Sequence, residues 1–391
     1  MNHKNALLLS GYHALSQKHW AEFVVHNTDF NWQLLALPAR YFSWRMRGAP
    51  LSFAALDEPA LAQPYDFLVA TSSVDLATVQ SLYPALRNIP SLLYFHENQF
   101  AYPKTNQPKA MIDWQMVNLY SALRADYLVF NSQFNQQSFL TGVTELMRKL
   151  PDLVPKGITE KLADKSSVLA VPIVEPRALK PDAHAVTSQT SSLPATDCKT
   201  ISSKALEKAT KASTQDNGIT VLWNHRWEWD KNPALLLEII KQVNEQALPI
   251  RFVLTGQQFR TVPTELQQIE QQFAHLIKQA GFIEQDEDYR ATLQQCDVVL
   301  STADHEFQGI AVMEAVSEGC VPLLPNRLSY PEFFDANFLY NGQKSIHQQA
   351  TSAVKKLKHW LQQGLPCSPD LSSFYQRNLT SDYQQLLNAI E

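Results

Sequence analysis

Residues 301–319 read STADHEFQGIAVMEAVSEG, and the pattern around this stretch decides the fold. An apolar run at Val298–Ser301 ends in a polar loop, Gly309 opens an apolar helix at Ile310–Glu318, and a second apolar run follows at Val321–Leu324. A short continuous apolar run with polar flanks indicates a strand that is buried on both faces, as in a parallel sheet. The order strand, helix, strand therefore predicts a βαβ unit.

The same alternation extends in both directions from this unit. Nearer the centre of the chain we expect strands at Ile219–Trp223 and Ile250–Thr255 and helices at Pro233–Gln246 and Glu265–Ala280. In the first part we expect strands at Ala6–Ser10, Tyr65–Ala70, Ser91–Phe95 and Tyr127–Phe130, and a helix at Ala110–Ala125. Two doubly wound, Rossmann-like α/β domains follow from this pattern.

The composition changes between the two domains. Residues 187–196 read TSQTSSLPAT, and almost no aromatic or branched apolar residues surround them. Such a segment cannot bury enough surface to offset its ordering entropy. We therefore expect a first domain at 1–174, a flexible linker or insertion at 175–217 and a second domain at 218–391. The domains should face each other across a cleft, with ligands beyond the carboxyl ends of the strands.

Composition excludes several classes of protein. With 391 residues of which 45% are hydrophobic, the chain can bury sizeable cores, and general disorder is excluded. No apolar run approaches the roughly 18 residues of a membrane span, and the run at Ala6–Leu9 is too short for a secretory signal. The net charge of -5 means that any nucleic acid would have to be held by local patches. We expect a cytoplasmic protein, because its four cysteines show neither a CxxC pair nor metal-ligand spacing: Cys198, Cys296, Cys320 and Cys367.

Two glutamates flank the helix start at Gly309. Glu306 lies in the loop before the helix and Glu314 lies within the helix. Backbone amides at a helix start form a ready anion site, so the loop, the amides and both carboxylates can address one extended ligand. The alternative is that Glu314 is a solvated helix residue and Glu306 an ordinary loop charge.

A second polar loop joins a strand to a helix at residues 223–233, which read WNHRWEWDKNP. Arg226 and Lys231 suit a diphosphate, the first through its bidentate fork and the second as a point charge. Pro233 occupies a favoured first-turn position of the following helix. The alternative is a surface turn in which the two cations pair with Glu228 and Asp230.

A third polar run follows an apolar strand at residues 94–103, which read YFHENQFAYP. Polar side chains packed behind a buried strand are costly unless they are hydrogen-bonded or used, so His96 is a candidate site residue. A lone histidine can also be a satisfied core residue. Asn131 follows the next strand in the same way, and Ser132 beside it is expected to cap a helix at Gln133–Leu140.

The amino-terminal part offers a glycine loop and an arginine cluster. Gly11 begins a loop that follows the first strand. Residues 40–47 read RYFSWRMR, which interleaves three arginines with three aromatic residues and contains no acid. Arginine beside stackable rings is a frequent means of gripping nucleic acid. The candidates for this role are Arg40, Trp44, Arg45 and Arg47; the same segment could equally be an amphipathic edge that closes the first domain.

Together these motifs resemble a known family. The Glu-x7-Glu block and the Arg…Lys-Asn-Pro loop resemble the retaining GT-B glycosyltransferases of the glycogen-synthase-like class. Three stretches resemble the tRNA-queuosine mannosyltransferases more closely: FHENQ…YP at 95–103, NHRWE…DKNP at 224–233 and HEF…LSYPE at 305–332. The resemblance covers 1–174 and 218–391. The first loop departs from the broad class, because it has the single Gly11 where many members carry two glycines.

The resemblance implies a role for each matching residue. Arg226 and Lys231 would neutralise a donor diphosphate, and Glu314 would bind the nucleotide ribose. Glu306 and the amides near Gly309 would hold the donor hexose and phosphate, and His96 would lie near the anomeric carbon, so Glu306 and His96 are the expected catalytic residues. The full set expected to bind the donor is Gly11, Asn131, Arg226, Lys231, Gly309, Ile310, Ala311 and Glu314.

The resemblance also implies the substrates. The donor would be GDP-mannose, and the acceptor would be the cyclopentene-diol of queuosine in a tRNA anticodon. We expect no metal cofactor, because the chain offers no Asp-x-Asp motif, and neither a membrane nor an obligate protein partner is expected. Two alternatives stay open: a glycosyltransferase of the same fold with a lipid, glycan or small-molecule acceptor, and a non-catalytic RNA-binding descendant.

Overall fold

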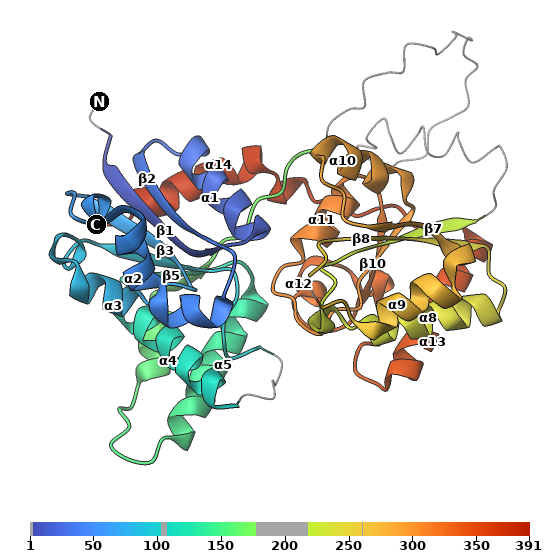
Figure 1. The fold of residues 1–391 in the computed structure, drawn as a ribbon, viewed down its shortest axis with the longest axis horizontal. Helices are drawn as coiled ribbons and strands as arrows, with labels where there is room; N and C mark the ends of the chain where they lie inside the picture. Colours follow the sequence, from blue (N-terminus) through green and yellow to red (C-terminus); the bar gives the residue numbers. More distant parts are fainter. Residues whose placement is uncertain (1–2, 103–107, 177–217, 260) are drawn as a thin grey trace, which may run out of the picture.

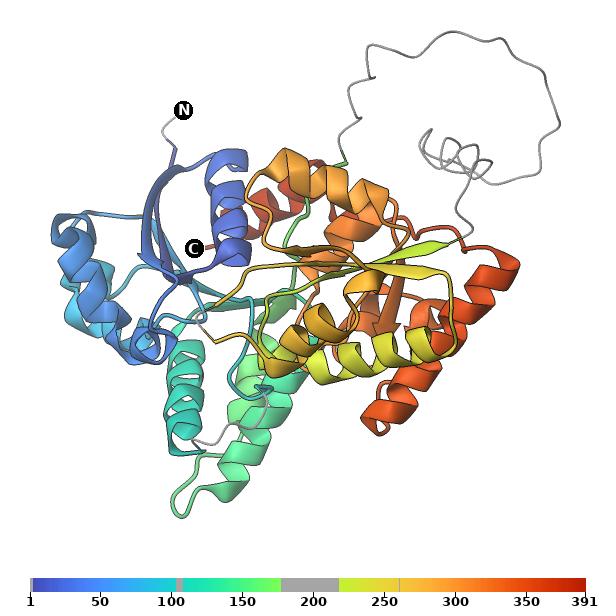
Figure 2. The same ribbon diagram turned by 45° about the vertical axis from the view of Figure 1, so that its right-hand side comes forward.

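The computed structural model describes residues 3–102, 108–176, 218–259 and 261–391 (Figure 1). Its core consists of two six-stranded sheets in which neighbouring strands are parallel. The sheets lie side by side in separate halves, each with helices packed on its faces (Figures 1 and 2). This arrangement confirms the predicted fold class of two Rossmann-like domains.

The first sheet has the strand order β2-β1-β3-β4-β5-β6. Its strands are β1 (Asn5–His13), β2 (Asn31–Pro38), β3 (Phe67–Thr71), β4 (Ser91–Phe95), β5 (Tyr127–Phe130) and β6 (Ser166–Val168). The helices of this half are α1 (Leu15–Asn27), α2 (Phe42–Leu61), α3 (Leu76–Leu82), α4 (Pro108–Arg124), α5 (Gln133–Lys149) and α6 (Ile158–Asp164). Every residue of β3 and β4 is buried, as the apolar runs predict for central strands of a parallel sheet.

The second sheet has the strand order β12-β11-β10-β7-β8-β9. Its strands are β7 (Ile219–Asn224), β8 (Ile250–Thr255), β9 (Ile277–Gly281), β10 (Val298–Leu300), β11 (Val321–Pro325) and β12 (Leu339–Tyr340). The helices after β7 are α8 (Pro233–Glu245), α9 (Thr264–Gln272), α10 (Asp286–Gln295), α11 (Ile310–Ser317), α12 (Tyr330–Phe333), α13 (Ile346–Gln363) and α14 (Gln376–Asn388). The strand order reverses between β7 and β10, which is where an open α/β sheet binds its ligand.

One predicted element is wrong. The helix expected at Glu265–Ala280 ends at Gln272, and β9 begins at Ile277. Residues of β9 pair with β8 at the edge of the sheet, where Val253 lies opposite Gln279. An edge strand has one covered side, so its polar residues do not form the apolar run that identifies a central strand.

The last helix changes the predicted domain boundary. Helix α14 packs against the first sheet and not the second, as both ribbon views show (Figures 1 and 2). Its Tyr383 is buried beside Phe23, and the Trp20 indole donates to the Tyr383 hydroxyl at 3.0 Å. The second domain therefore does not extend to residue 391, because the apolar face of α14 completes the core of the first half.

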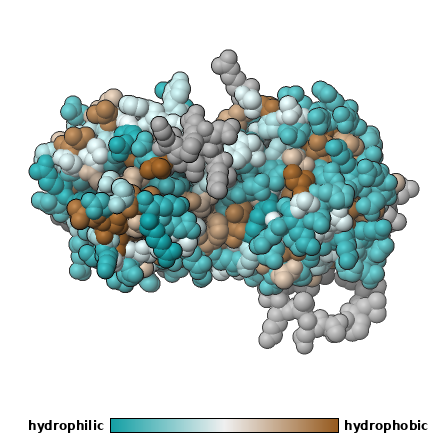
Figure 3. All heavy atoms as spheres, turned by 90° about the horizontal axis from the view of Figure 1, so that it is seen from below, coloured by the Kyte–Doolittle hydropathy of each residue, from teal (hydrophilic) through white to brown (hydrophobic). Residues whose placement is uncertain are grey.

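The rest of the chain adds two observations. The linker predicted at 175–217 falls almost wholly on residues 177–217, which lie outside the described residues. The face seen in Figure 3 is mostly hydrophilic, with small separate hydrophobic patches on both halves. Within the four described ranges, no helix combines the length and the hydropathy that a membrane span requires.

Candidate active site

Two loops of the second half meet at the point where the strand order reverses. The loop after β7 contains residues 225–232, and the loop after β10 contains residues 301–309. They are joined by hydrogen bonds to backbone carbonyls: the Asp304 amide donates to the Asp230 carbonyl at 2.9 Å, and the Thr302 hydroxyl donates to the Lys231 carbonyl at 2.6 Å. The structure thus brings together the two polar loops that the sequence singled out.

Lys231 lies at the centre of this junction. Its buried ammonium donates to the His305 carbonyl at 2.7 Å. The same nitrogen lies 3.4 Å from the Glu306 carboxylate and 3.5 Å from the Asp230 carboxylate. Burial alone would raise the pKa of Glu306, but the positive charge of Lys231 and its hydrogen bond to the carboxylate hold this pKa below its ordinary value. Glu306 is therefore ionised at neutral pH and is more than an ordinary loop charge.

Arg226 takes part in the pairing that the surface-turn alternative predicts. Its guanidinium lies 2.8 Å from the Glu228 carboxylate and 3.8 Å from the Asp230 carboxylate. Burial opposes ionisation of Asp230, yet the contact with His305 and the charges of Lys231 and Arg226 hold the Asp230 pKa well below its usual range. The two cations are thus fixed in place by acids, and the half-exposed guanidinium of Arg226 remains available to a further anion.

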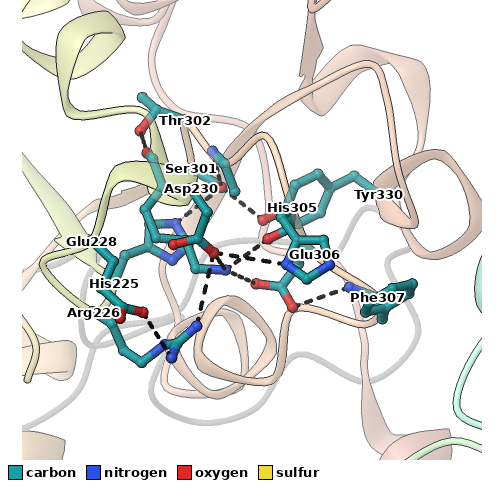
Figure 4. A network of polar contacts seen from close by, with 12 residues as sticks. His225, Arg226, Glu228, Asp230, Ser301, Thr302, His305, Glu306, Phe307 and Tyr330 are labelled. Atoms are coloured by element: carbon teal, nitrogen blue, oxygen red, sulfur yellow. Dashed lines mark hydrogen bonds and ion pairs between the residues drawn. The ribbon is translucent and has the colours of Figure 1, made fainter. Parts of the chain in front are cut away.

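A chain of hydrogen bonds between side chains links the loop after β7 to the loop after β10. The His225 ring lies 3.0 Å from the Ser301 hydroxyl, which lies 2.7 Å from the Tyr330 hydroxyl (Figure 4). Burial lowers the pKa of His225 to about 3, so this ring is neutral at physiological pH. Sequence reasoning missed all three residues as members of the site, although His225 and Tyr330 belong to stretches that carry the family resemblance.

Gly309 begins helix α11 with a backbone that favours glycine. Its φ of 83° is left-handed, and a Cβ at this position would lie 3.0 Å from the Tyr330 ring. Ile310 and Ala311 form the first turn of α11, and the Ala311 carbonyl accepts from the Asn224 side chain at 2.7 Å. The helix start predicted after the polar loop is therefore present, with its first amides free of intrahelical acceptors.

Glu314 lies on α11 among side chains of α10 and is not a freely solvated helix residue. Burial raises the pKa of its carboxyl to about 7, although the charge of Arg290 and a hydrogen bond with Tyr289 oppose this increase. The Tyr289 hydroxyl also accepts from the Asn224 side chain at 3.1 Å. These contacts connect Glu314 through Tyr289 with the last residue of β7; that Glu306 and Glu314 face one ligand stays a prediction.

His96 follows β4 in the first half and is only 7% exposed. Its ring packs edge-on against Trp20 and tilted against Tyr94, with centroid distances of 4.9 and 4.7 Å. Among the described residues, neither ring nitrogen has a hydrogen-bond partner. Burial lowers the pKa of His96 to about 3, so the ring is neutral. It does not fit the alternative of a satisfied core histidine, because buried polar atoms of this kind ordinarily have partners.

Asn131 and Gly11 each fix a local backbone arrangement in the first half. The side-chain nitrogen of Asn131 donates to the His96 carbonyl at 3.0 Å, and its side-chain oxygen accepts from the Asn135 side chain at 2.8 Å. Asn131 therefore positions the loop of His96. Ser132 caps α5 as predicted, accepting from the Asn135 amide at 3.0 Å. A Cβ at Gly11 would lie 2.8 Å from the Ser73 carbonyl, so only glycine allows this approach. Their expected contact with a donor stays a prediction.

The two halves meet through the loops that carry the predicted site. The Tyr102 ring lies 4.4 Å from the His305 ring, centroid to centroid, which joins the segment after His96 to the loop of Glu306. The Glu332 carboxylate accepts from the first two amides of α5, Gln133 at 2.8 Å and Phe134 at 3.0 Å. An acid at a helix N-terminus is stabilising, so Glu332 fixes one half to the other close to the site.

The arginine cluster is partly exposed. Trp44 is 52% exposed, and Arg40 is exposed beside the Tyr41 ring. The Arg47 side chain is 61% exposed and lies 3.8 Å from the Asp75 carboxylate. Arg45 differs, because it is buried and donates to the Ser52 hydroxyl at 2.8 Å. The interpretation of Arg45 as a nucleic-acid contact is therefore corrected: its guanidinium is used within the first half.

The ranges that the structure describes contain no group of three or more His, Cys, Asp or Glu side chains arranged to hold a metal ion. The cations at the site belong to Arg226 and Lys231.

Comparison with known proteins agrees with the motifs. Residues 5–173 match the model of the tRNA-queuosine alpha-mannosyltransferase N-terminal family, and residues 206–374 match that of glycosyl transferases group 1. A Drosophila melanogaster protein described as tRNA-queuosine alpha-mannosyltransferase is 33% identical over 314 residues, which are 80% of this chain and 77% of the fly protein.

Solved structures share the fold at low sequence identity. Anabaena HepE in complex with UDP-glucose aligns with a TM-score of 0.59 and 13% identity, over 99% of this chain and 100% of that one. The Candida albicans trehalose-6-phosphate phosphatase N-terminal domain aligns with a TM-score of 0.63 and 11% identity, over 99% of this chain and 97% of that one. The fold is thus that of the GT-B glycosyltransferases, and the chain is a glycosyltransferase that belongs to the tRNA-queuosine alpha-mannosyltransferase family.

Proposed function

We propose that this protein transfers mannose from GDP-mannose to the cyclopentene-diol of queuosine in tRNA, with retention of configuration at the anomeric carbon. The name of the Drosophila relative and the match of residues 5–173 support the acceptor and the alpha linkage. The observation that carries the chemistry is the buried Lys231 ammonium, held 3.4 Å from Glu306 in the loop before the start of α11.

The first role, which Lys231 and Arg226 share, is stabilisation of the leaving diphosphate. Departure of GDP places negative charge on the phosphate, and preorganised positive charge in a site of low dielectric lowers the barrier. Lys231 supplies a fixed point charge, and the half-exposed Arg226 supplies a fork that can bind two oxygens. Glu228 and Asp230 balance these cations, which keeps both side chains in position.

The remaining donor contacts follow from the placement of the carboxylates. Glu306 can accept hydrogen bonds from mannose hydroxyls, because it is ionised and lies in the loop before α11. Glu314, beside the loop after β7, can accept from the ribose hydroxyls. His96 is neutral, so its unpartnered nitrogens can contact the transferring sugar without adding charge.

The reaction can be written without a second carboxylate acting as nucleophile. The acceptor oxygen forms a bond to the anomeric carbon on the face that the diphosphate leaves, while the bond from that carbon to the phosphate oxygen breaks. The departing phosphate oxygen takes the proton of the acceptor hydroxyl, and GDP is released. A pair of carboxylates about 5 Å apart, as in retaining hydrolases, is therefore not required. We propose that no metal is needed either, which activity in excess EDTA would check.

The acceptor requires a surface for RNA on a protein of net charge -5. The exposed residues Arg40, Trp44 and Arg47 offer two positive charges and a stackable ring on the first half. Phosphate contacts position a nucleic acid, and stacking holds its unpaired bases, as in an anticodon loop. We propose that the protein acts on tRNA in the cytoplasm.

The test is to incubate the purified protein with GDP-mannose and queuosine-containing tRNA, and then to digest the RNA and analyse its nucleosides by mass spectrometry. A queuosine nucleoside that carries one added hexose supports the proposal. UDP-glucose replaces GDP-mannose in a parallel reaction to test the donor. Turnover of GDP-mannose with a glycan or lipid acceptor, and none with this tRNA, would favour the alternative acceptors.

A further inference from the structure

The polar side chains of loop 96–101 in the first half differ in whether their atoms have hydrogen-bond partners within the protein. Asn98 is used to build the loop: its amide nitrogen donates to the Asn135 side chain at 2.8 Å and to Ser138 at 2.9 Å. Its amide oxygen accepts from the backbone amides of Phe100 and Ala101 at 2.9 and 3.0 Å. Both ends of this side chain are therefore used within the protein.

Further side chains fix the loop from outside. The Asn118 side chain accepts from the Gln99 backbone amide at 2.9 Å and donates to the Ser72 carbonyl at 2.9 Å. The Ser72 hydroxyl donates to the Glu97 carbonyl at 2.8 Å. The backbone of Glu97 and Gln99 is thus held by hydrogen bonds, which gives their side chains fixed points of attachment.

In contrast, polar atoms of the other side chains of the loop have no hydrogen-bond partner within the described residues. The Glu97 carboxylate is half-buried and has neither a hydrogen bond nor an ion pair there. The Gln99 side chain is 3% exposed, and its amide oxygen has no hydrogen-bond partner. The ring nitrogens of His96 and the amide oxygen of Gln99 are therefore buried polar atoms whose desolvation is not offset, which is a cost that a bound ligand would remove.

Among these side chains, Glu97 lies near the donor loops of the second half. Tyr102, which follows this loop, lies against His305 at 4.4 Å. Burial raises the pKa of Glu97, while the charges of His305 and Arg226 oppose that increase, so its carboxylate lies within electrostatic range of the opposite half. Burial and the negative charge of Glu97 likewise raise the pKa of Tyr102.

The negative charge of Glu97 indicates which substrate Glu97 and Gln99 can bind. A carboxylate would repel the donor diphosphate, which the cations of the second half already bind. A neutral vicinal diol, in contrast, donates hydrogen bonds that a carboxylate and an amide oxygen can accept, and bonds to a charged acceptor are stronger than those between neutral groups. We propose that Glu97 and Gln99 bind the vicinal diol of the acceptor and hold one hydroxyl toward the anomeric carbon. This inference rests on the proposed function and assigns the recognition of its acceptor.

The experiment compares wild-type protein with Glu97→Gln, Glu97→Asp and the control Glu145→Gln, which removes an exposed charge from α5 in the same half. Loss of a hydrogen bond to a charged group should raise the KM for queuosine-containing tRNA about 10- to 100-fold in Glu97→Gln. Glu97→Asp keeps the charge and should recover part of this loss. The affinity for GDP, measured by calorimetry, should stay within about twofold in every variant, since the diphosphate contacts lie on the second half.

A second measurement separates the diol from the rest of the tRNA. The Kd is measured for queuosine-containing tRNA and for the same tRNA with guanosine in place of queuosine. Wild-type protein should prefer the modified tRNA, and Glu97→Gln or Gln99→Ala should bring the ratio of the two Kd values toward one. A Glu97→Gln variant whose acceptor KM and Kd ratio match the wild type would overturn the inference, and so would an equal loss of GDP affinity. Failure of the wild-type protein to mannosylate queuosine would contradict the proposed function instead.

Discussion

The Lys231 ammonium lies 3.4 Å from the Glu306 carboxylate, and this ion pair connects the loop after β7 with the loop after β10. Three helices (α8, α9 and α10) and three strands (β8, β9 and β10) lie between these residues in the sequence, so their contact is a property of the fold. It places the cation proposed for the diphosphate directly beside the acid proposed for the sugar. The same pair makes the site depend on both loops, because loss of either residue leaves a buried charge without its partner.

Removal of the site cations should reduce turnover strongly. Lys231→Ala and Arg226→Ala should each lower kcat about 10²- to 10³-fold, or about 3 to 4 kcal/mol, as for other preorganised charge-stabilising groups. Lys231→Ala should also lower Tm, since Asp230 and Glu306 would lose a buried counter-charge, whereas Arg226→Ala should change Tm less because its guanidinium is half-exposed. Steady-state kinetics and thermal unfolding measure these effects. Turnover within threefold of wild type for both variants would remove the cations from the mechanism.

The two glutamates should differ in the kinetic parameter that they control. Glu306→Gln should lower kcat more than donor affinity, because Glu306 is proposed to contact the reacting sugar. Glu314→Gln should raise the KM for GDP-mannose more, because Glu314 is proposed to contact the ribose. Initial rates over a matrix of donor and acceptor concentrations separate the two. The opposite pattern would mean that the roles are exchanged.

Donor binding should weaken as pH falls through neutrality. The pKa of Glu314 is raised to about 7 in the folded chain, so the carboxylate that accepts ribose hydrogen bonds is replaced by the acid below that pH. GDP affinity should therefore be higher at pH 8 than at pH 6. The stability effect has the opposite sign: a raised carboxyl pKa favours the folded state at acid pH, and this contribution is lost as pH rises from about 4.5 through 7.

Calorimetric titration of GDP at pH 6 and pH 8 tests this pH dependence. Glu314→Gln provides the control, because it removes the titrating group while keeping the side-chain size. Its GDP affinity should keep only the pH dependence that comes from the terminal phosphate of GDP itself, whose pKa is about 6. A wild-type affinity that is flat with pH, or a variant that keeps the full dependence, would assign the titration to another group.

The arginine cluster should separate into surface and structural residues. The double variant Arg40→Ala with Arg47→Ala should weaken tRNA binding and reduce the salt dependence of binding by about one to two phosphate contacts. Arg45→Ala should instead lower Tm, because its buried guanidinium donates to Ser52. Filter binding at several salt concentrations measures the first effect. Unchanged tRNA affinity in the double variant would exclude this surface, and GDP affinity serves as the control for folding.

The central strands and both polar loops of the site could be predicted from the sequence. Strands β4 and β5 begin and end where the apolar runs at Ser91–Phe95 and Tyr127–Phe130 predict, because strands buried on both faces are apolar throughout. The edge strands β2 and β9 are half-exposed, so their mixed composition gave no such signal. The contact of Arg226 with Glu228 was anticipated only as an alternative to its role in diphosphate binding, and the structure is compatible with both.

Contacts between distant parts of the chain could not be predicted. Tyr383 of α14 packs against Trp20, and Glu332 caps α5 in the other half, because the fold brings these segments together. Arg45 lies in the same motif as the exposed Arg47, and only the direction of each side chain on α2 separates a buried residue from a surface one. The role of a residue such as Arg45 depends on the partner that its side chain contacts in the folded chain, and the sequence does not reveal that partner.

The most direct test of the account is whether queuosine in tRNA gains a mannose. Purified protein is incubated with GDP-mannose and either queuosine-containing tRNA or the same tRNA with guanosine in its place, and the released nucleosides are analysed by mass spectrometry before and after treatment with an α-mannosidase. The account predicts a hexosylated queuosine that α-mannosidase converts back to queuosine, with no product from the guanosine tRNA and almost none from the Lys231→Ala variant. GDP release without any hexosylated queuosine, or equal product from both tRNAs, would contradict it.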